Sequence, residues 1–230
     1  MTAGGNTTVT LDPRLLCAAT LVPACEVAAD IGCDHGRLAV YLLQTGRCSR
    51  VIASDISPAS RERAGALFMR LGISDRVTLS GRDGLDALTE PVGAVVISGM
   101  GGKTIARILA QDVDLHDAAL ILSPQTDLPL ARDAVYRRGY HIRAEYAVQS
   151  RGRHYLVWEA LPGVGEMSEA ERMVGVALSD CAPGSAREYM LWQLRVALSW
   201  QGDEGSVYRK YLEEALSHAR NEGSGSPRLD

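Results

Sequence analysis

The chain has 230 residues, of which 46% are apolar and 23% charged, a composition that excludes disordered, collagen-like and low-complexity proteins. No apolar run approaches the roughly 20 residues of a membrane span, and no cationic stretch followed by an apolar one begins the chain, so we expect a cytoplasmic protein. The formal net charge of −4 argues against a surface covered with phosphate-binding cations.

Short apolar, β-branched segments alternate with segments of helical period over the first 160 residues. Asp12-Pro13 and Ser57-Pro58 each have the pattern of an N-cap followed by a first-turn proline. The first predicted helix begins at residue 12, and four further helices are predicted at residues 37–44, 58–71, 103–110 and 128–138. The predicted strands occupy residues 25–31, 51–54, 77–80, 94–98, 119–122, 140–148 and 155–160.

Strands that are linked by helices form parallel sheets with right-handed crossovers. The last two predicted strands have only Arg151-Gly152-Arg153 and its neighbours between them, which indicates an antiparallel hairpin. The sequence therefore predicts an α/β fold with a seven-stranded, mostly parallel sheet and an antiparallel edge hairpin.

After Pro162-Gly163 the strand pattern stops, and three helical segments are predicted at residues 169–179, 186–200 and 206–221. Their short connections favour antiparallel neighbours. We expect one domain over residues 1–161 and a small helical domain over residues 162–230, of which residues 223–230 form a frayed tail.

The cysteines are Cys17, Cys25, Cys33, Cys48 and Cys181. An odd number without a CxxC pair favours neither a disulfide framework nor a zinc site, and the histidines lack metal-ligand spacing. We expect reduced thiols and no bound metal.

The strongest local motif follows the first sheet strand and reads Asp30-Ile31-Gly32-Cys33-Asp34-His35-Gly36. Ligands of open α/β sheets bind at this end of the strands. A dinucleotide-binding loop has glycine at the position of Asp34, and a carboxylate there would repel a pyrophosphate, which disfavours NAD and FAD. A cationic cofactor without phosphate, S-adenosylmethionine, fits the loop better.

Carboxylates also follow the next two strands. Asp55 lies where an acidic side chain conventionally accepts hydrogen bonds from ribose hydroxyls, and Asp83 is placed to receive an adenine amino group. Each aspartate could instead cap a helix or a turn. Four aspartates at successive strand ends, counting Asp30 and Asp34, favour a single cleft in which a bound cation offsets their repulsion.

The fourth strand ends in Ser98-Gly99-Met100-Gly101-Gly102-Lys103. Three glycines in four residues indicate a sharp turn or the close approach of a ligand, here between cofactor and substrate. The same glycines could serve only the entry into the following helix.

Six arginines and only two acidic residues lie in the segment 132–153; the arginines are Arg132, Arg137, Arg138, Arg143, Arg151 and Arg153. A solvated basic face is one explanation of this segment, and contact with RNA phosphates is the other.

Five segments, in this order and spacing, resemble the bacterial TrmK family, the tRNA (adenine(22)-N(1))-methyltransferases. They are residues 30–36, Ala53-Ser54-Asp55-Ile56, Arg82-Asp83-Gly84-Leu85, Gly99-Met100-Gly101-Gly102 and Leu120-Ile121-Leu122-Ser123-Pro124-Gln125. The resemblance runs from about Arg14 to Ala160. This sequence departs from the family pattern at Arg37, where the resemblance leads us to expect an aromatic residue. It also departs at residues 123–125, where the family tends to have Gln-Pro-Asn.

The resemblance implies a Rossmann-like class I methyltransferase domain, a helical, coiled-coil-like C-terminal domain, S-adenosyl-L-methionine as cofactor and tRNA as partner. The implied reaction is methylation of N1 of adenine 22, in the D-arm region. The expected cofactor residues are Asp30, Gly32, Cys33, Asp34, His35, Gly36, Asp55, Ile56, Asp83, Gly84, Gly99 and Met100.

Asp34 and His35 are the candidate catalytic residues, although His35 could be purely structural. The expected substrate contacts are Arg14, Arg37, Gly101, Gly102, Pro124, Gln125, Arg132, Arg151 and Arg153. Two other functions stay open. One is a class I methyltransferase acting on another RNA, a small molecule or a protein, and the other is a non-catalytic, S-adenosylmethionine-binding module that interacts with RNA. We expect a monomer.

Overall fold

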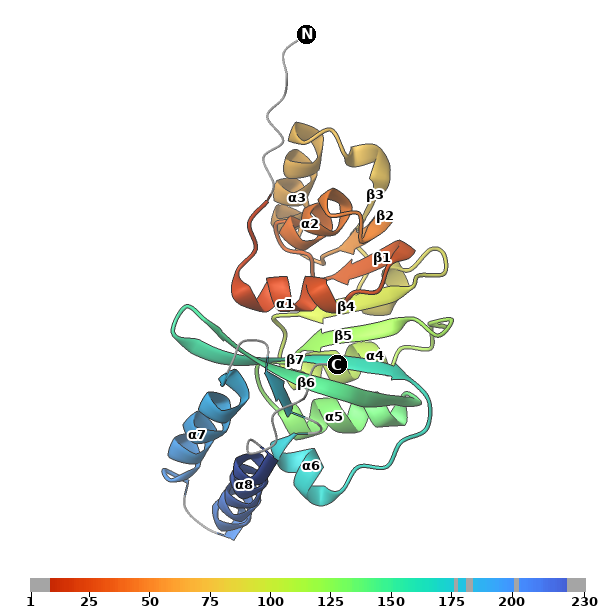
Figure 1. Ribbon diagram of the computed structural model, residues 1–230. Helices are drawn as coiled ribbons and strands as arrows, with labels where there is room; N and C mark the ends of the chain where they lie inside the picture. Colours follow the sequence, from red (N-terminus) through yellow and green to blue (C-terminus); the bar gives the residue numbers. More distant parts are fainter. Residues whose placement is uncertain (1–8, 176–177, 181–183, 201–202, 223–230) are drawn as a thin grey trace, which may run out of the picture.

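Figure 1 shows the protein as a computed structural model, in which residues 9–175, 178–180, 184–200 and 203–222 are described. Its eight strands form one sheet in the order β3-β2-β1-β4-β5-β7-β6-β8. The strands are β1 (Cys25–Ile31), β2 (Cys48–Ser54), β3 (Val77–Ser80), β4 (Ala94–Ser98), β5 (Ala119–Ser123), β6 (Tyr140–Ser150), β7 (Arg153–Pro162) and β8 (Leu178–Asp180).

The helices cover both faces of this sheet and one of its ends. They are α1 (Pro13–Leu21), α2 (Arg37–Gln44), α3 (Pro58–Arg70), α4 (Gly102–Leu109), α5 (Leu128–Arg137), α6 (Glu169–Val174), α7 (Ser185–Ala197) and α8 (Asp203–Glu222). Asp12 and Ser57 cap α1 and α3 as predicted, each accepting a hydrogen bond from a first-turn N–H.

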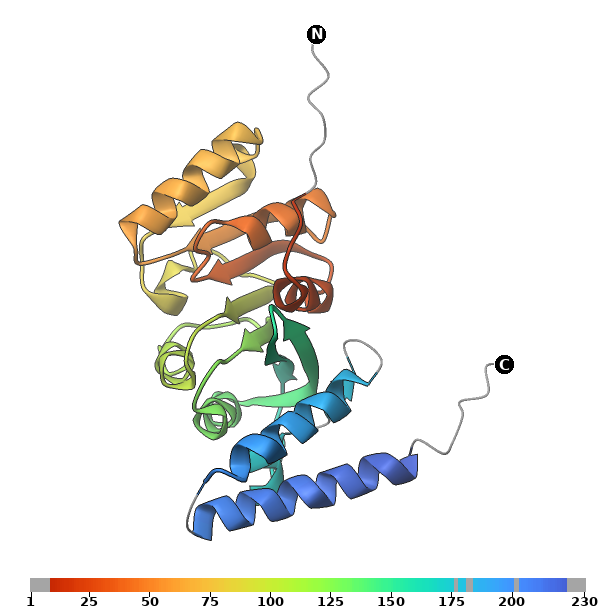
Figure 2. The same cartoon turned by 90° about the vertical axis from the view of Figure 1, so that its left-hand side faces the viewer.

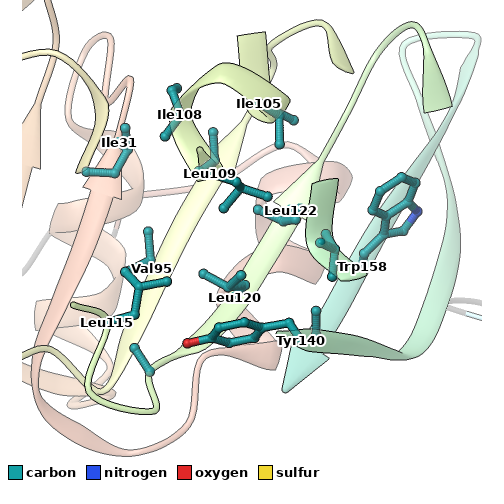
Figure 3. Packing of buried hydrophobic residues seen from close by; sticks show 14 of the residues in the cluster. Ile31, Val95, Ile105, Ile108, Leu109, Leu115, Leu120, Leu122, Tyr140 and Trp158 are labelled. Carbon is teal, nitrogen blue, oxygen red and sulfur yellow. The ribbon is translucent and has the colours of Figure 1, made fainter. Parts of the chain in front are cut away.

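Alternate residues of the central strands enter two separate cores. Ala94 and Val96 pack with α1, α2 and α3 on one face. Val95 and Ile97 pack with α4 and α5 on the other, where Ile105 and Leu109 of α4 lie over the sheet (Figure 3). Because both faces are buried, the strands are continuously apolar, and the predicted α/β fold is confirmed.

The parallel strands β1 to β5 are followed by the predicted antiparallel hairpin of β7 and β6. Both hairpin strands are longer than predicted, and Ser150 pairs with Arg153 across a two-residue turn. Arg151 and Gly152 in this turn have φ of 51° and 74°. Two positive φ values are typical of the type I′ turn, whose twist matches that of the paired strands.

The helix predicted over residues 169–179 is wrong in its second half. The helix α6 ends at Val174, because Gly175 has φ of 130° and leaves the helical conformation. The chain then forms β8, which pairs in parallel with Glu145, Tyr146 and Ala147 of β6. This eighth strand had no sequence signal, since its stability comes from the free edge of β6.

The two remaining helices lie beyond the β6 end of the sheet, side by side (Figures 1 and 2). The helix α7 contacts β6, and Tyr189 and Trp192 of α7 join the core of the α4 and α5 face. The C-terminal segment is thus attached to the sheet by β8 and α7.

Four described cysteines, Cys17, Cys25, Cys33 and Cys48, form no disulfide bond with one another. Burial raises the pKa of Cys48 to about 12 and that of Cys33 further, so both resist ionisation. Cys181 and residues 223–230 lie outside the described residues. Within the described ranges, no helix is long and apolar enough to cross a membrane, and no three His, Cys, Asp or Glu side chains gather as metal ligands.

Candidate active site

The site lies at the carboxyl ends of β1, β2, β4 and β5, where the strand order changes direction beside β1. The loop after β1 turns through three left-handed residues, Gly32, Asp34 and Gly36. The N–H groups of Gly32 and Cys33 donate to the carbonyl oxygen of Ser54 at 2.7 and 2.9 Å. The loop is therefore held against the end of β2.

A cavity of about 390 Å³ opens in front of this loop, and we call it the acidic cavity. Its lining includes most of the predicted cofactor residues, namely Asp30, Gly32, Cys33, Asp34, His35, Asp55, Gly99 and Met100. Three predicted substrate residues, Arg14, Arg37 and Gln125, also line it. Leu15, Leu38 and Ser98 line it as well and were not predicted.

Asp30 is the buried carboxylate of the acidic cavity, with an exposed fraction of 4%. Its Oδ2 atom has no hydrogen-bond partner among the described residues. Burial raises the pKa of Asp30 to about 7; a backbone hydrogen bond from Ala39 opposes the rise, and the charges of Asp55 and Asp34 add to it. A buried oxygen of this kind requires a donor, and a cation would favour its ionised form.

Asp55 organises the loop through both of its carboxylate oxygens. Oδ2 accepts from the N–H of Asp34 at 3.1 Å, and Oδ1 accepts from the N–H of Ser57 at 2.8 Å. A carboxylate has about four acceptor positions, so Asp55 can accept further hydrogen bonds from a ligand hydroxyl.

Asp34 and His35 form a surface pair at the rim of the acidic cavity. The Oδ2 atom of Asp34 lies 2.5 Å from Nδ1 of His35, and more than half of the Asp34 side chain is exposed. The pair is therefore accessible to a substrate that enters the cavity.

A smaller cavity of about 90 Å³ adjoins the acidic one, and both are lined by Gly32, Asp55 and Met100. Asp83, Gly84 and Ile56, three further predicted cofactor residues, line this side cavity. Both carboxylate oxygens of Asp83 accept from Arg107, at 2.6 and 3.0 Å. The hydrogen bonds from Arg107 lower the pKa of Asp83 and keep it charged.

A third cavity of about 450 Å³ lies between the loop after β5, the β6–β7 hairpin and α7, and we call it the aromatic cavity. Pro124 and Gln125 line it, together with Arg153. Its other side chains include His154, Tyr155, Tyr189, Trp192 and Gln193, which sequence reasoning did not place at the site. No local signal identifies them, because the packing of α7 against the hairpin is a tertiary contact.

Three glycines that were predicted to contact cofactor or substrate, Gly36, Gly101 and Gly102, do not line these cavities. Gly36 begins α2 and lines none of these cavities; a Cβ there would lie 2.4 Å from the ring of Phe68. Gly101 and Gly102 serve packing between two loops, since a Cβ on Gly102 would lie 2.4 Å from the carbonyl oxygen of Asp127. At these two positions the absence of a side chain lets the glycine-rich turn approach the loop after β5.

Four of the six arginines in the segment 132–153 are exposed, Arg143 among them, and only Arg132 is buried. Arg132 is fully buried and pairs with Glu145 through two hydrogen bonds of 2.7 Å, so its predicted RNA contact is wrong. Arg138 donates to the carbonyl oxygens of Gln111 and Val113, and Arg143 pairs with Glu159. Arg137, Arg151 and Arg153 are exposed.

Arg14 and Arg37 come from different helices to the acidic cavity. Arg37 donates to the carbonyl oxygen of Thr10. The guanidinium of Arg14 lies 5.2 Å from the ring centroid of Tyr155, and its Nη1 is buried with no hydrogen-bond partner in the described part of the chain.

Comparison with known proteins agrees with this architecture. Residues 11–158 match the family model described as a methyltransferase domain. The tRNA (adenine(22)-N(1))-methyltransferase of Bacillus subtilis (strain 168) is 30% identical over 156 residues, which make up 66% of this chain and 66% of that protein. The aligned part thus spans 66% of the length of this relative.

Solved structures with the same fold cover nearly the whole chain. A Streptococcus pneumoniae protein has a TM-score of 0.78 at 23% identity, covering 90% of this chain and 100% of its own, and it has also been crystallised with S-adenosyl-L-methionine. The B. subtilis m1A22 tRNA methyltransferase TrmK has a TM-score of 0.71 at 22% identity, covering 93% and 98%. The predicted resemblance to TrmK is confirmed, and the chain belongs to the methyltransferase-domain family.

Proposed function

We propose that this protein transfers a methyl group from S-adenosylmethionine to N1 of an adenine in tRNA, and that adenine 22 is the target. The observation that carries the proposal is the orphaned Oδ2 atom of Asp30, buried in an acidic cavity at the switch point of the sheet. Asp34 and Asp55 add negative charge there. Such a cavity suits a cationic ligand and repels a pyrophosphate.

The residues present fit S-adenosylmethionine. Asp30 would accept from the ammonium group, Asp55 from the ribose hydroxyls and Asp83, in the side cavity, from the adenine amino group. The aliphatic side chains of Ile56 and Met100 would contact the adenine ring. When bound, the cofactor supplies an electrophilic methyl group.

The chain has to position the adenine more than to activate it, since N1 carries a free lone pair at neutral pH. Methylation at N1 leaves a positive charge on the base. We assign Asp34 the role of stabilising this charge, because its carboxylate is exposed at the cavity rim and its pairing with His35 orients it.

The substrate reaches the acidic cavity past Arg14, Arg37 and the loop at Pro124 and Gln125. Arg151 and Arg153 at the hairpin would contact RNA phosphates, which fix the position of the RNA without reading its sequence. Because N1 lies on the Watson–Crick edge, a paired adenine has to leave its stack before it can react.

Methyl transfer to an unmodified tRNA transcript tests the proposal, with the product nucleosides identified by mass spectrometry. We expect N1-methyladenosine with the wild-type protein and none when adenine 22 is replaced by guanine. Asp30→Asn should abolish binding of S-adenosylhomocysteine in calorimetry. Asp75→Asn is the matched control, because Asp75 is exposed and precedes β3, at the opposite end of the strand.

Cofactor binding without methylation of any RNA would contradict the proposal and favour a non-catalytic module. If the protein methylates another RNA, a small molecule or a protein instead, the proposed methyl transfer is correct and the proposed substrate is wrong. As part of the same proposal, the protein works as a cytoplasmic monomer, with its methyltransferase domain in residues 1–161 and a helical domain in residues 162–230.

A further inference from the structure

The aromatic cavity is built by two parts of the chain, and one of them lies outside the methyltransferase-domain match. The family model ends at residue 158, whereas Tyr189, Trp192 and Gln193 come from α7. The volume of about 450 Å³ lies within the range of about 300–1,000 Å³ that is usual for ligand pockets. The helix α7 therefore completes a pocket and does not merely cover the sheet.

The walls of this cavity are flat, aromatic and held in place. The rings of His154 and Trp192 are stacked with centroids 5.3 Å apart and an interplanar angle of 29°, and the Tyr189 ring lies 5.9 Å from that of Trp192. Gln193 donates to the hydroxyl of Tyr189 at 2.6 Å, and both side chains are buried. Trp192, His154 and Tyr155 are only half-buried, so part of each ring remains accessible.

The aromatic cavity is a neighbour of the acidic cavity. Gln125 lines both. Tyr155 lines the aromatic cavity, and the guanidinium of Arg14 lies against its ring. Arg14 in turn lines the acidic cavity, and its Nη1 atom is buried without a hydrogen-bond partner among the described residues. A ligand in the aromatic cavity would thus lie next to the place where a methyl group is offered.

The charge of the cavity selects the kind of ligand. Arg153 lines it, Arg151 is exposed at the adjacent turn, and its lining contains no aspartate or glutamate among the described residues. Aromatic rings bind the faces of nucleobases, and arginines bind the phosphates that join them.

We propose that the aromatic cavity binds an unstacked nucleobase of the RNA substrate, with the stacked rings of Trp192 and His154 as the wall on which the base lies. This proposal rests on the proposed function. It makes α7 part of the substrate site, to which the helix contributes shape and a stacking surface.

Substitution of Trp192 tests the proposal, because base stacking on an aromatic side chain contributes about 1–3 kcal/mol per base. With an unmodified tRNA transcript, Trp192→Ala should lower kcat/KM by about 5- to 150-fold, by conversion of that range. Trp192→Phe keeps a flat ring and should restore most of the loss. Neither variant should change the dissociation constant of S-adenosylhomocysteine.

Trp200 offers a matched control, since it follows α7, is stacked on Tyr208 at 5.2 Å and lies outside the cavity lining. Trp200→Ala should leave kcat/KM unchanged. The transcript should quench the tryptophan fluorescence of the wild type and of Trp200→Phe, but that of Trp192→Phe much less. Quenching that persists in Trp192→Phe, or a Trp192→Ala variant within twofold of wild type, would overturn the proposal.

The cavity can also be tested if tRNA is not a substrate. A titration with a single-stranded oligoadenylate of about ten nucleotides, a length within the usual site sizes, needs no methyl transfer. Quenching that requires Trp192 would support the nucleobase site while the proposed function fails. If tRNA is methylated equally well with and without the Trp192 side chain, the proposed function stands and the proposed nucleobase site is excluded.

Discussion

The side chain of Met100 lies directly against Gly32, so that a Cβ on Gly32 would be 2.2 Å from the Cε atom of Met100. Both residues line the acidic cavity and the side cavity. The contact therefore marks the boundary between the two spaces. A ligand that extends from one cavity into the other has to pass this methionine.

Gly32→Ala should displace Met100 and strain the loop, which has φ of 78° at this position. We expect an affinity for S-adenosylhomocysteine that is lower by about tenfold or more, corresponding to at least about 1.4 kcal/mol. Calorimetry measures this directly. Gly139→Ala is the control, because Gly139 has φ of 84° but no atom within 4 Å of the added Cβ.

The control should lose about 1–2 kcal/mol of stability from the left-handed backbone alone and bind the ligand normally. Equal ligand affinities in the two glycine variants would show that the methionine contact does not shape the site.

The stability of the ligand-free protein should depend on the ionisation of Asp30. Its pKa of about 7 in the folded protein lies above the usual 3.8, so the folded state binds this proton more tightly than the unfolded state. The free energy of unfolding should therefore decrease as the pH rises from about 4 to about 7, by up to about 1.4 kcal/mol per pH unit. Urea denaturation of wild type and Asp30→Asn at several pH values measures this contribution, which the variant should lack.

Cofactor binding should have the opposite pH dependence. A cationic ligand favours the ionised form of Asp30, so the affinity for S-adenosylmethionine should decrease below about pH 7, by up to tenfold per pH unit. Calorimetry in the range between pH 5.5 and pH 7 checks the slope. An affinity that is constant over this range would show that Asp30 does not contact the cation.

Arg132 should be a structural residue rather than an RNA contact. Its side chain and that of Glu145 are both fully buried, and Arg132 also stacks on Trp158 at 4.9 Å and donates to the carbonyl oxygen of Arg172 at 3.0 Å. Arg132→Met removes one partner of a buried ion pair and should cost about 3–5 kcal/mol of stability.

Thermal unfolding of Arg132→Met and Arg50→Met measures this difference. Arg50 also forms ion pairs, with Glu26 and Glu90, but its side chain is 42% exposed. We expect a much smaller decrease in its melting temperature. A stable Arg132→Met protein with weakened tRNA binding would instead restore the original interpretation of this arginine.

Arg151 should contribute to RNA binding without contributing to folding. Its φ of 51° at the hairpin turn suits asparagine better than arginine. Arg151→Asn should therefore keep or raise the melting temperature, while it weakens tRNA binding and reduces the salt slope of log K by about one. Binding measured at two salt concentrations decides this, and an unchanged slope would exclude a phosphate contact.

The lining of the acidic cavity was largely predictable because its residues belong to the strands and to the loops that directly follow them. The strand ends at Asp30, Asp55 and Asp83 meet at one edge in any parallel sheet of this order, and the glycine at position 32 is required locally. The surroundings of the arginines were predicted less well. Arg132 is one of six arginines in the segment 132–153, and only the packing of α5 against β6 shows that it is buried.

The sequence by itself determined the alternation of strands and helices, the antiparallel hairpin and the acidic loop, because periodicity, caps and turn residues act over a few neighbours. Only the tertiary structure decided where β8 pairs, which glycines serve packing and which arginines face solvent. It alone brought Trp192 to His154, since contacts between residues 38 positions apart depend on how α7 packs, and no local pattern records that packing.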